Sequence, residues 1–361
     1  MKHLCTLLLL LLMAGPVMGA LQDGQVDEIR IIRVGAVLPL DGQWAGIGTQ
    51  CETALTFAQD TVNEYLRPHN LGIELVIRNS GSDPGQARSA LQSLYEEGIM
   101  AVIGPVTSEE AAGMVSYADE NGILLLSPSS TAVDLARDDN LFRMAPGDQN
   151  QADALTLLME RRNITGILTV FIDDVYGSGL NMAMNEKAAN QESGFRVIKS
   201  IPFEPTLSRY DDLIGEIESA AEELPPDSGA ILLIGPESQA TGIFSSIGPE
   251  SPLRDIKWFA GDGIIHEAGI LYNPDAAAFA VQTRLEGVSF ACEETTTLVP
   301  LMLATGRLSA ELGSAPAPDA LPAWEALWFI AEAYRISPDP DIGTLKTTIR
   351  SVFERGGNLF N

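Results

Sequence analysis

The chain alternates short apolar, β-branched runs with longer segments of helical periodicity, and this alternation restricts its fold more than any other feature. Apolar runs occupy residues 31–38, 73–78, 99–103 and 123–126, and helical spacing of apolar residues fills the segments between them. Strands that alternate with helices form mostly parallel sheets with helices on both faces. The sequence therefore predicts an α/β fold of doubly wound parallel sheets.

The same rhythm occurs a second time, after residue 145. Predicted helices alternate here with predicted strands, at 148–163, 167–172, 179–191, 195–201, 210–223, 230–234 and 256–260. A chain of about 340 residues without its leader is long enough for two domains with sizeable cores. We expect two doubly wound lobes, with residues 28–145 in lobe 1 and residues 146–290 in lobe 2.

The first twenty residues have the features of a secretory signal peptide. Met1–His3 provide a cationic start, Leu4–Met13 an apolar core, and Gly19 and Ala20 the small residues of a cleavage site. The core is too short for a comfortable membrane span, and an uncleaved anchor is the alternative. We expect residues 1–20 to be removed and the mature protein to be secreted across the cytoplasmic membrane, periplasmic or extracellular, without membrane insertion.

The composition excludes several kinds of partner. The chain has 49 acidic and 22 basic residues, a net charge of −27, which argues against binding to nucleic acid or anionic membranes. Cys51 and Cys292 lack CxxC spacing and His neighbours, so zinc is not expected, and either two buried thiols or a disulfide remains open. Asp173 and Asp174 could bind a metal or be solvated. We predict no metal and no cofactor.

Two polar stretches, 106–110 and 127–131, each follow a predicted buried strand. Ligands of open α/β sheets lie at the carboxyl ends of the strands, and helix N-termini there carry partial positive charge. The hydroxyls of Ser108 and Thr131, with nearby backbone N–H groups, could therefore hold a small carboxylate. The alternative is that both residues are ordinary helix N-caps.

No catalytic set is recognisable. A Ser-His-Asp arrangement would need His69 or His266, and there is no G-x-S-x-G elbow or P-loop. The glycines of 42–48 are misplaced for a dinucleotide fingerprint, and we interpret 177–179 as a turn. A two-lobed exported protein of this kind is predicted to be a small-molecule receptor and not an enzyme.

Several segments together resemble the type 1 periplasmic solute-binding proteins of the branched-chain amino acid transporter kind (leucine/isoleucine/valine-binding protein-like). Their order and spacing are characteristic, at 34–42, 83–84, 102–105, 127–131, 174–179 and 261–263, within a match from 31 to 360. The resemblance implies two lobes joined by a hinge, with residues 291–361 returning to lobe 1. It also implies a receptor that closes around an amino acid or similar small carboxylate and delivers it to an ABC transporter permease. A ligand-sensing ectodomain working with a signalling partner is the alternative.

The resemblance also implies individual roles. Ser108, with Ser129 and Thr131, would hold the ligand α-carboxylate from lobe 1. Tyr176 would contribute from lobe 2, and Asp262 would pair with the ligand ammonium. Each of the last two has a simpler alternative, a packed aromatic and a helix N-cap.

The chain departs from the family pattern at several positions. The family's disulfide cysteines fall near Ser82 and Thr107, so that bridge is not expected. Aromatic cleft positions appear here as Ile47 and Glu237, although Trp44 lies close by. Glu237 either lines the pocket and selects a polar or cationic side chain, or is a solvated acid. We also expect the family's terminal lobe 2 strands to be missing, in a short protein or a truncated reading frame.

Overall fold

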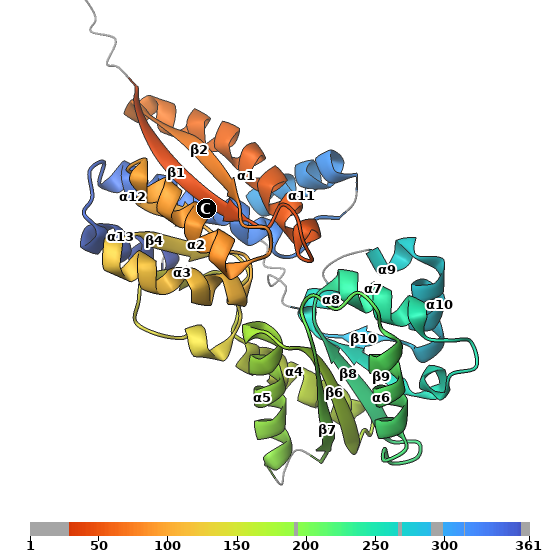
Figure 1. Cartoon of the computed structure of the whole chain (residues 1–361). Coiled ribbons are helices and arrows are strands. Elements are labelled where there is room, and N and C mark those ends of the chain that lie inside the picture. Colours follow the sequence, from red (N-terminus) through yellow and green to blue (C-terminus); the bar gives the residue numbers. More distant parts are fainter. Residues whose placement is uncertain (1–28, 191–193, 266–268, 290–298, 314, 355–361) are drawn as a thin grey trace, which may run out of the picture.

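The computed structural model describes residues 29–190, 194–265, 269–289, 299–313 and 315–354. It contains two lobes, each built on a five-stranded sheet in which every pair of neighbouring strands is parallel (Figure 1). Helices cover both faces of each sheet. The predicted α/β fold with two doubly wound parallel-sheet lobes is therefore confirmed.

Lobe 1 is organised around the sheet of order β2-β1-β3-β4-β5. Its strands are β1 (Arg30–Leu38), β2 (Leu71–Asn79), β3 (Ala101–Ile103), β4 (Leu124–Ser127) and β5 (Leu141–Arg143). One face carries α1 (Ala45–Leu66), α12 (Ala320–Ile336) and α13 (Ile342–Glu354), and the other carries α2 (Pro84–Glu96) and α3 (Ser108–Asn121). The helix α11 (Val299–Leu312) packs against α1, and short 3-10 helices occur at Arg67–His69 and Val133–Leu135.

Lobe 2 is organised around the sheet of order β10-β9-β8-β6-β7. Its strands are β6 (Gly166–Ile172), β7 (Arg196–Phe203), β8 (Gly229–Ile234), β9 (Lys257–Ala260) and β10 (Glu286–Gly287). The helices α4 (Asp148–Arg161) and α5 (Val175–Ala189) lie on one face, and α6 (Asp211–Ala221), α7 (Glu237–Ser246) and α10 (Pro274–Thr283) on the other (Figure 1). Short helices α8 (Asp262–Ile265) and α9 (Gly269–Tyr272) follow β9, and a 3-10 helix spans Pro252–Asp255.

Two local predictions were wrong, both at helix starts. Thr49 and Glu52 have the spacing of a capping box and predict that the first helix opens there, but α1 begins earlier, at Ala45, with Trp44 at the N-cap position. The segment 177–179 is not a turn but lies inside α5.

The start of α5 shows why glycine is found there. Asp174 caps α5 by accepting from the Gly177 N–H at 2.8 Å. A Cβ at Gly177 would lie 2.0 Å from the Ile172 carbonyl oxygen. Gly177 is therefore required by the close approach of the helix to its own strand, and not by a turn.

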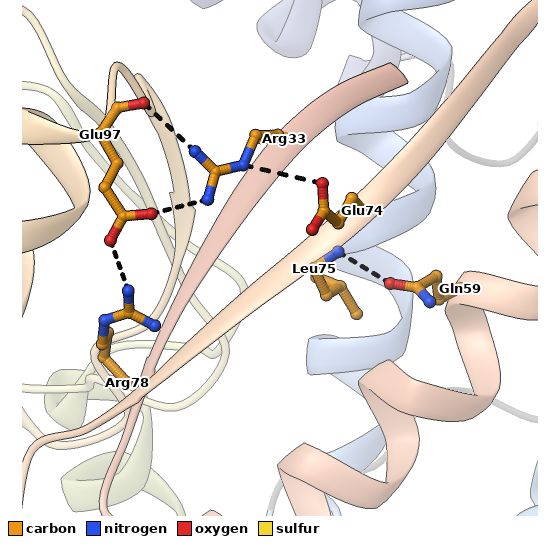
Figure 2. Close-up of polar contacts among 6 residues, drawn as sticks. All are labelled: Arg33, Gln59, Glu74, Leu75, Arg78 and Glu97. Carbon is orange, nitrogen blue, oxygen red and sulfur yellow. Dashed lines mark hydrogen bonds and ion pairs between the residues drawn. The ribbon is translucent and has the colours of Figure 1, made fainter. Parts of the chain in front are cut away.

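Side chains from α1 close the outer edge of β2, the edge strand of the lobe 1 sheet. Asn63 Oδ1 accepts from the Ile73 N–H at 2.6 Å, and its Nδ2 donates to the Ile73 carbonyl at 3.0 Å. Gln59 Oε1 accepts from the Leu75 N–H at 2.7 Å (Figure 2). These amides supply the hydrogen bonds that another strand would make, so the edge is not open to strand addition.

An ion-pair network ties the end of α2 to β1 and β2 (Figure 2). The Glu97 carboxylate accepts from Arg33 at 2.6 Å and also pairs with Arg78, while Arg33 lies 3.7 Å from Glu74. The hydrogen bond from Arg33 is the main reason that the pKa of Glu97 is lowered. The network therefore joins the C-terminal end of α2 to the two strands.

We predict that Asn63→Ala destabilises lobe 1 by about 1–3 kcal/mol, because two buried backbone groups of β2 lose their partner. The matched control is Asp60→Ala, an exposed position on the same helix, which should change stability by less than about 0.5 kcal/mol. Urea denaturation of the two variants and the wild type measures the difference. Equal stability of the two variants would contradict this account of the β2 edge.

Candidate functional site

A pocket lies where the carboxyl ends of the two sheets face each other. Lobe 1 and lobe 2 both supply its walls: Trp44, Ile47, Val106, Thr107, Ser108, Ser129, Thr131, Tyr176, Asp262 and Gly263. The free space enclosed between these walls is about 30 Å³. Trp44 meets Tyr176, and Glu109 accepts from the Val175 N–H, so the two lobes are in contact around the pocket.

Ser108 joins the loop after β3 to the loop after β4. Its hydroxyl oxygen accepts from the backbone N–H groups of Thr131 and Ala132, each at 3.1 Å. Because a hydroxyl oxygen has two lone pairs, both are occupied, and the proton remains available for donation. Ser108, 3% exposed, therefore acts toward the pocket as a hydrogen-bond donor.

The N-cap alternative fails for both hydroxyl residues. Thr107 caps α3 in a capping box: its Oγ1 accepts from the Glu110 N–H at 3.2 Å, and Glu110 Oε2 accepts from the Thr107 N–H at 3.2 Å. Thr131 precedes the 3-10 helix Val133–Leu135, whose N-cap is Ala132. Ser108 and Thr131 are thus positioned for something other than capping.

Tyr176 and Asp262 form a hydrogen-bonded pair on the lobe 2 wall. Tyr176 donates its hydroxyl proton to Asp262 Oδ1 at 2.7 Å, and the Gly263 N–H donates to the same oxygen at 2.8 Å. Burial, followed by the charge of Asp262, raises the pKa of Tyr176 well above its usual value. The pair places a buried carboxylate, with Asp262 8% exposed, at the pocket.

Trp44 crosses from lobe 1 to lobe 2 and helps to keep the lobes together. Its ring meets Tyr176 edge-on, with centroids 6.1 Å apart and planes at 77°. A Cβ at Gly263 would lie 3.1 Å from the Trp44 indole, so glycine at this position allows the indole to approach. Trp44 is 6% exposed in this arrangement.

Polar contacts also join the lobes beside the pocket. Glu109 of α3 accepts from the Val175 N–H, the first of α5, at 2.8 Å. Ser238 of α7 donates to the Gln43 carbonyl at 2.9 Å. The Glu109 contact places a carboxylate on a helix N-terminus, where the helix dipole favours negative charge.

Comparisons with known proteins identify the family. Residues 50–345 match the model of the receptor family ligand binding region. The chain belongs to this family. A relative from Methanocaldococcus jannaschii, an uncharacterized protein, is 26% identical over 281 residues, which cover 75% of this chain and 66% of the relative.

Two other similarities concern proteins named for branched-chain amino acids. The Leu/Ile/Val-binding protein homolog 3 of Brucella melitensis is 26% identical over 196 residues, which cover 54% of this chain and 53% of that protein. The chain thus spans about half to two thirds of these relatives' lengths. The branched-chain amino acid transporter substrate binding protein LivJ from Streptococcus pneumoniae, solved with isoleucine, has 20% identity and a TM-score of 0.71, covering 89% of this chain and 88% of that one. The fold is that of type 1 periplasmic binding proteins.

This family member has a second buried acid that sequence reasoning missed. Asp148, the first residue of α4, is 0% exposed, and its backbone N–H donates to the Thr131 carbonyl at 2.9 Å. Its Oδ1 accepts from Gln151 at 3.2 Å, while Oδ2 has no hydrogen-bond partner in the described part of the chain. Burial and the charge of Asp262 raise the pKa of Asp148 to about 8. Gln151 links the two acids, since it also accepts from the Asp262 N–H at 3.0 Å.

The remaining predicted residues lie as follows. Glu237 is buried at the start of α7 but does not line the pocket, and its carboxylate accepts from Thr241 at 2.5 Å. Asp174 caps α5 and Asp173 accepts from Ser178 at 3.3 Å. Over the described ranges, no three acidic, His or Cys side chains converge as a metal site would require. Cys292 and the predicted signal peptide lie outside the described residues.

In the part of the chain that the structure describes, every helix is too short or too polar to span a membrane.

We predict that Asp148→Asn makes the ligand-free protein more stable at pH 9. The folded-state pKa is raised, so the stability associated with the protonated form is complete below about pH 4 and is lost as the pH rises through about 8. Each pKa unit corresponds to about 1.4 kcal/mol, so the wild type should lose a few kcal/mol that the variant keeps. Thermal melts from pH 4 to 9 test this, with the exposed Asp134→Asn as control. Parallel pH curves for wild type and Asp148→Asn would contradict the prediction.

Proposed function

We propose that the protein is the extracytoplasmic solute receptor of an ABC importer and binds an amino acid or a related small carboxylate by closure of its lobes. The observation that carries the proposal is the composition of the pocket, which is lined by a hydroxyl donor from lobe 1, Ser108, and by a buried carboxylate from lobe 2, Asp262. Two relatives are named as Leu/Ile/Val-binding proteins, which supports an amino acid as the ligand. Export through the leader and delivery to a permease belong to the same proposal.

The lobe 1 wall suits the ligand carboxylate. Ser108 keeps its proton free because Thr131 and Ala132 fill its lone pairs. It lies at the start of α3, where the first backbone N–H groups carry partial positive charge. A carboxylate can therefore bind here without a Lys or Arg side chain among the residues that line the pocket.

The acidic groups of lobe 2 suit a protonated amine. Asp262 lines the pocket, and Asp148 lies behind it with one carboxylate oxygen that accepts no hydrogen bond among the described residues. The two acids repel each other enough to raise the pKa of Asp148, after the effect of burial. An ammonium group would relieve this repulsion, since a buried charge is stabilised by pairing.

The division of the walls between the lobes supports binding by closure. Ser108 and Trp44 belong to lobe 1, whereas Tyr176 and Asp262 belong to lobe 2, so a ligand touches all four only when the lobes are together. A ligand shifts such an equilibrium by its differential affinity for the closed state. The pocket holds no Ser-His or Cys-His pair that could act as a nucleophile and base.

The test is a thermal-shift screen of the proteinogenic amino acids, followed by calorimetry of Asp262→Asn. The variant should bind the best amino acid at least about tenfold more weakly, because a charge-assisted hydrogen bond is lost. Binding of the matching acid without the amine, such as 4-methylpentanoate for L-leucine, should change little. Asp212→Asn, exposed on α6, is the control. Failure of every amino acid to bind would overturn the proposed function, and equal losses for both ligands would remove Asp262 from the ammonium role.

The contact between Glu109 and α5 gives a prediction about closure itself. Glu109→Ala removes a hydrogen bond that joins the lobes but does not touch the pocket lining. It should weaken binding of every ligand by the same factor, about three- to tenfold, because it lowers the population of the closed state.

The control for this prediction is Glu120→Ala, exposed at the far end of α3. Calorimetry with two ligands of different size compares the factors. Loss of affinity for one ligand only would show that Glu109 acts on the ligand and not on the closure equilibrium.

A further inference from the structure

A carboxylate lies behind the lobe 1 wall of the pocket, on the segment that returns from lobe 2. Asp319, immediately before α12, is 0% exposed. Its Oδ1 accepts a hydrogen bond from the hydroxyl of Ser129 at 2.5 Å. Ser129 lines the pocket and Asp319 does not, so any effect of Asp319 on a ligand passes through Ser129.

The position of Asp319 in the helix makes this contact unusual. It occupies the N-cap position of α12, where an Asp side chain normally accepts from backbone N–H groups of the first turn. Its side chain makes no such capping hydrogen bond. Its backbone carbonyl accepts from the Ala323 N–H at 3.3 Å, and the Cys51 thiol lies 3.7 Å from the same oxygen. The carboxylate is turned away from its own helix and toward Ser129.

This contact fixes the polarity of the Ser129 hydroxyl. A hydroxyl has one proton, and Ser129 donates it to Asp319 Oδ1. The proton of Ser129 is therefore committed to Asp319, and the hydroxyl presents lone pairs to the pocket. Ser108 has the opposite polarity, since its lone pairs are occupied and its proton is available. Two serines on one wall thus offer one donor and one acceptor.

We infer that Asp319 is a positioning residue that holds Ser129 as a hydrogen-bond acceptor for the protonated amine of the ligand, in place of the role toward the carboxylate that the family resemblance implies for this serine. The inference rests on the proposed function and adds a residue to the recognition of amines. Asp319 thereby connects α12, far along the chain, to ligand selection at the loop after β4. The hydroxyl of Ser129 discriminates against a carboxylate that lacks the amine, because that ligand leaves the acceptor unsatisfied.

The experiment compares L-leucine with 4-methylpentanoate, or another amino acid with its own des-amino acid if the screen selects one. Calorimetry is done on wild type, Asp319→Ala, Asp319→Asn, Ser129→Ala and the double variant Ser129→Ala/Asp319→Ala. Asp319→Ala should weaken the amino acid about tenfold more than the des-amino acid. Asp319→Asn keeps an oxygen that can accept from Ser129, and should restore the preference to within about threefold of wild type. The double variant should match Ser129→Ala.

The outcomes separate this inference from the proposed function. If wild type binds amino acids but Asp319→Ala weakens both ligands equally, Asp319 only supports the fold and the inference is wrong. An additional loss of preference in the double variant beyond that of Ser129→Ala would also overturn it, because the effect would not pass through Ser129. Wild type that binds no amino acid overturns the proposed function, and the inference with it. Thermal melts identify any variant that fails to fold, and Asp319→Asn then carries the comparison.

Discussion

The hydroxyl oxygen of Ser108 accepts hydrogen bonds from the backbone N–H groups of Thr131 and Ala132, and the arrangement of the pocket wall depends on these two bonds. They draw the loop after β4 onto the start of α3, which fixes Thr131 and positions Ser129 beside it. The same loop continues to Asp148, whose N–H donates to the Thr131 carbonyl at 2.9 Å. Through Thr131, the Ser108 side chain therefore helps to position Asp148 relative to the lobe 1 wall.

The acidic residues near the pocket are in keeping with the excess of acidic residues in the whole chain. With a net charge of −27, the protein supplies few cations to neutralise a buried carboxylate. Ion pairs such as Arg33–Glu97 and Lys199–Glu216 lie at the surface, whereas Asp148 is fully buried without an ion pair among the described residues. Because its pKa is raised to about 8, Asp148 is largely protonated at neutral pH, and an ammonium group on the ligand would favour its ionised form by pairing with it.

The strands and the polar residues at their carboxyl ends could be predicted from the sequence. The helix start at Ala45 and the buried acid Asp148 near the pocket could not. Apolar runs are local signals, so the two sheets and the placement of Ser108 and Tyr176 at strand ends could be anticipated. The predicted capping box at Thr49 was wrong, because α1 already begins at Ala45 and Thr49 lies inside it. Asp148 was missed because acids are common in the first turn of helices, where they interact favourably with the helix dipole, so an Asp there does not indicate a binding site. Its burial involves neighbours distant in the sequence, Thr131 and Asp262, which no local pattern records.

Closure explains why contacts that are individually small can be decisive together. Trp44 against Tyr176, Glu109 on the start of α5 and Ser238 on the Gln43 carbonyl all join lobe 1 to lobe 2. None of them needs a ligand, so they bias the lobes toward each other before binding. The ligand then decides the equilibrium, because only the closed state offers both its donor wall and its acidic wall at once.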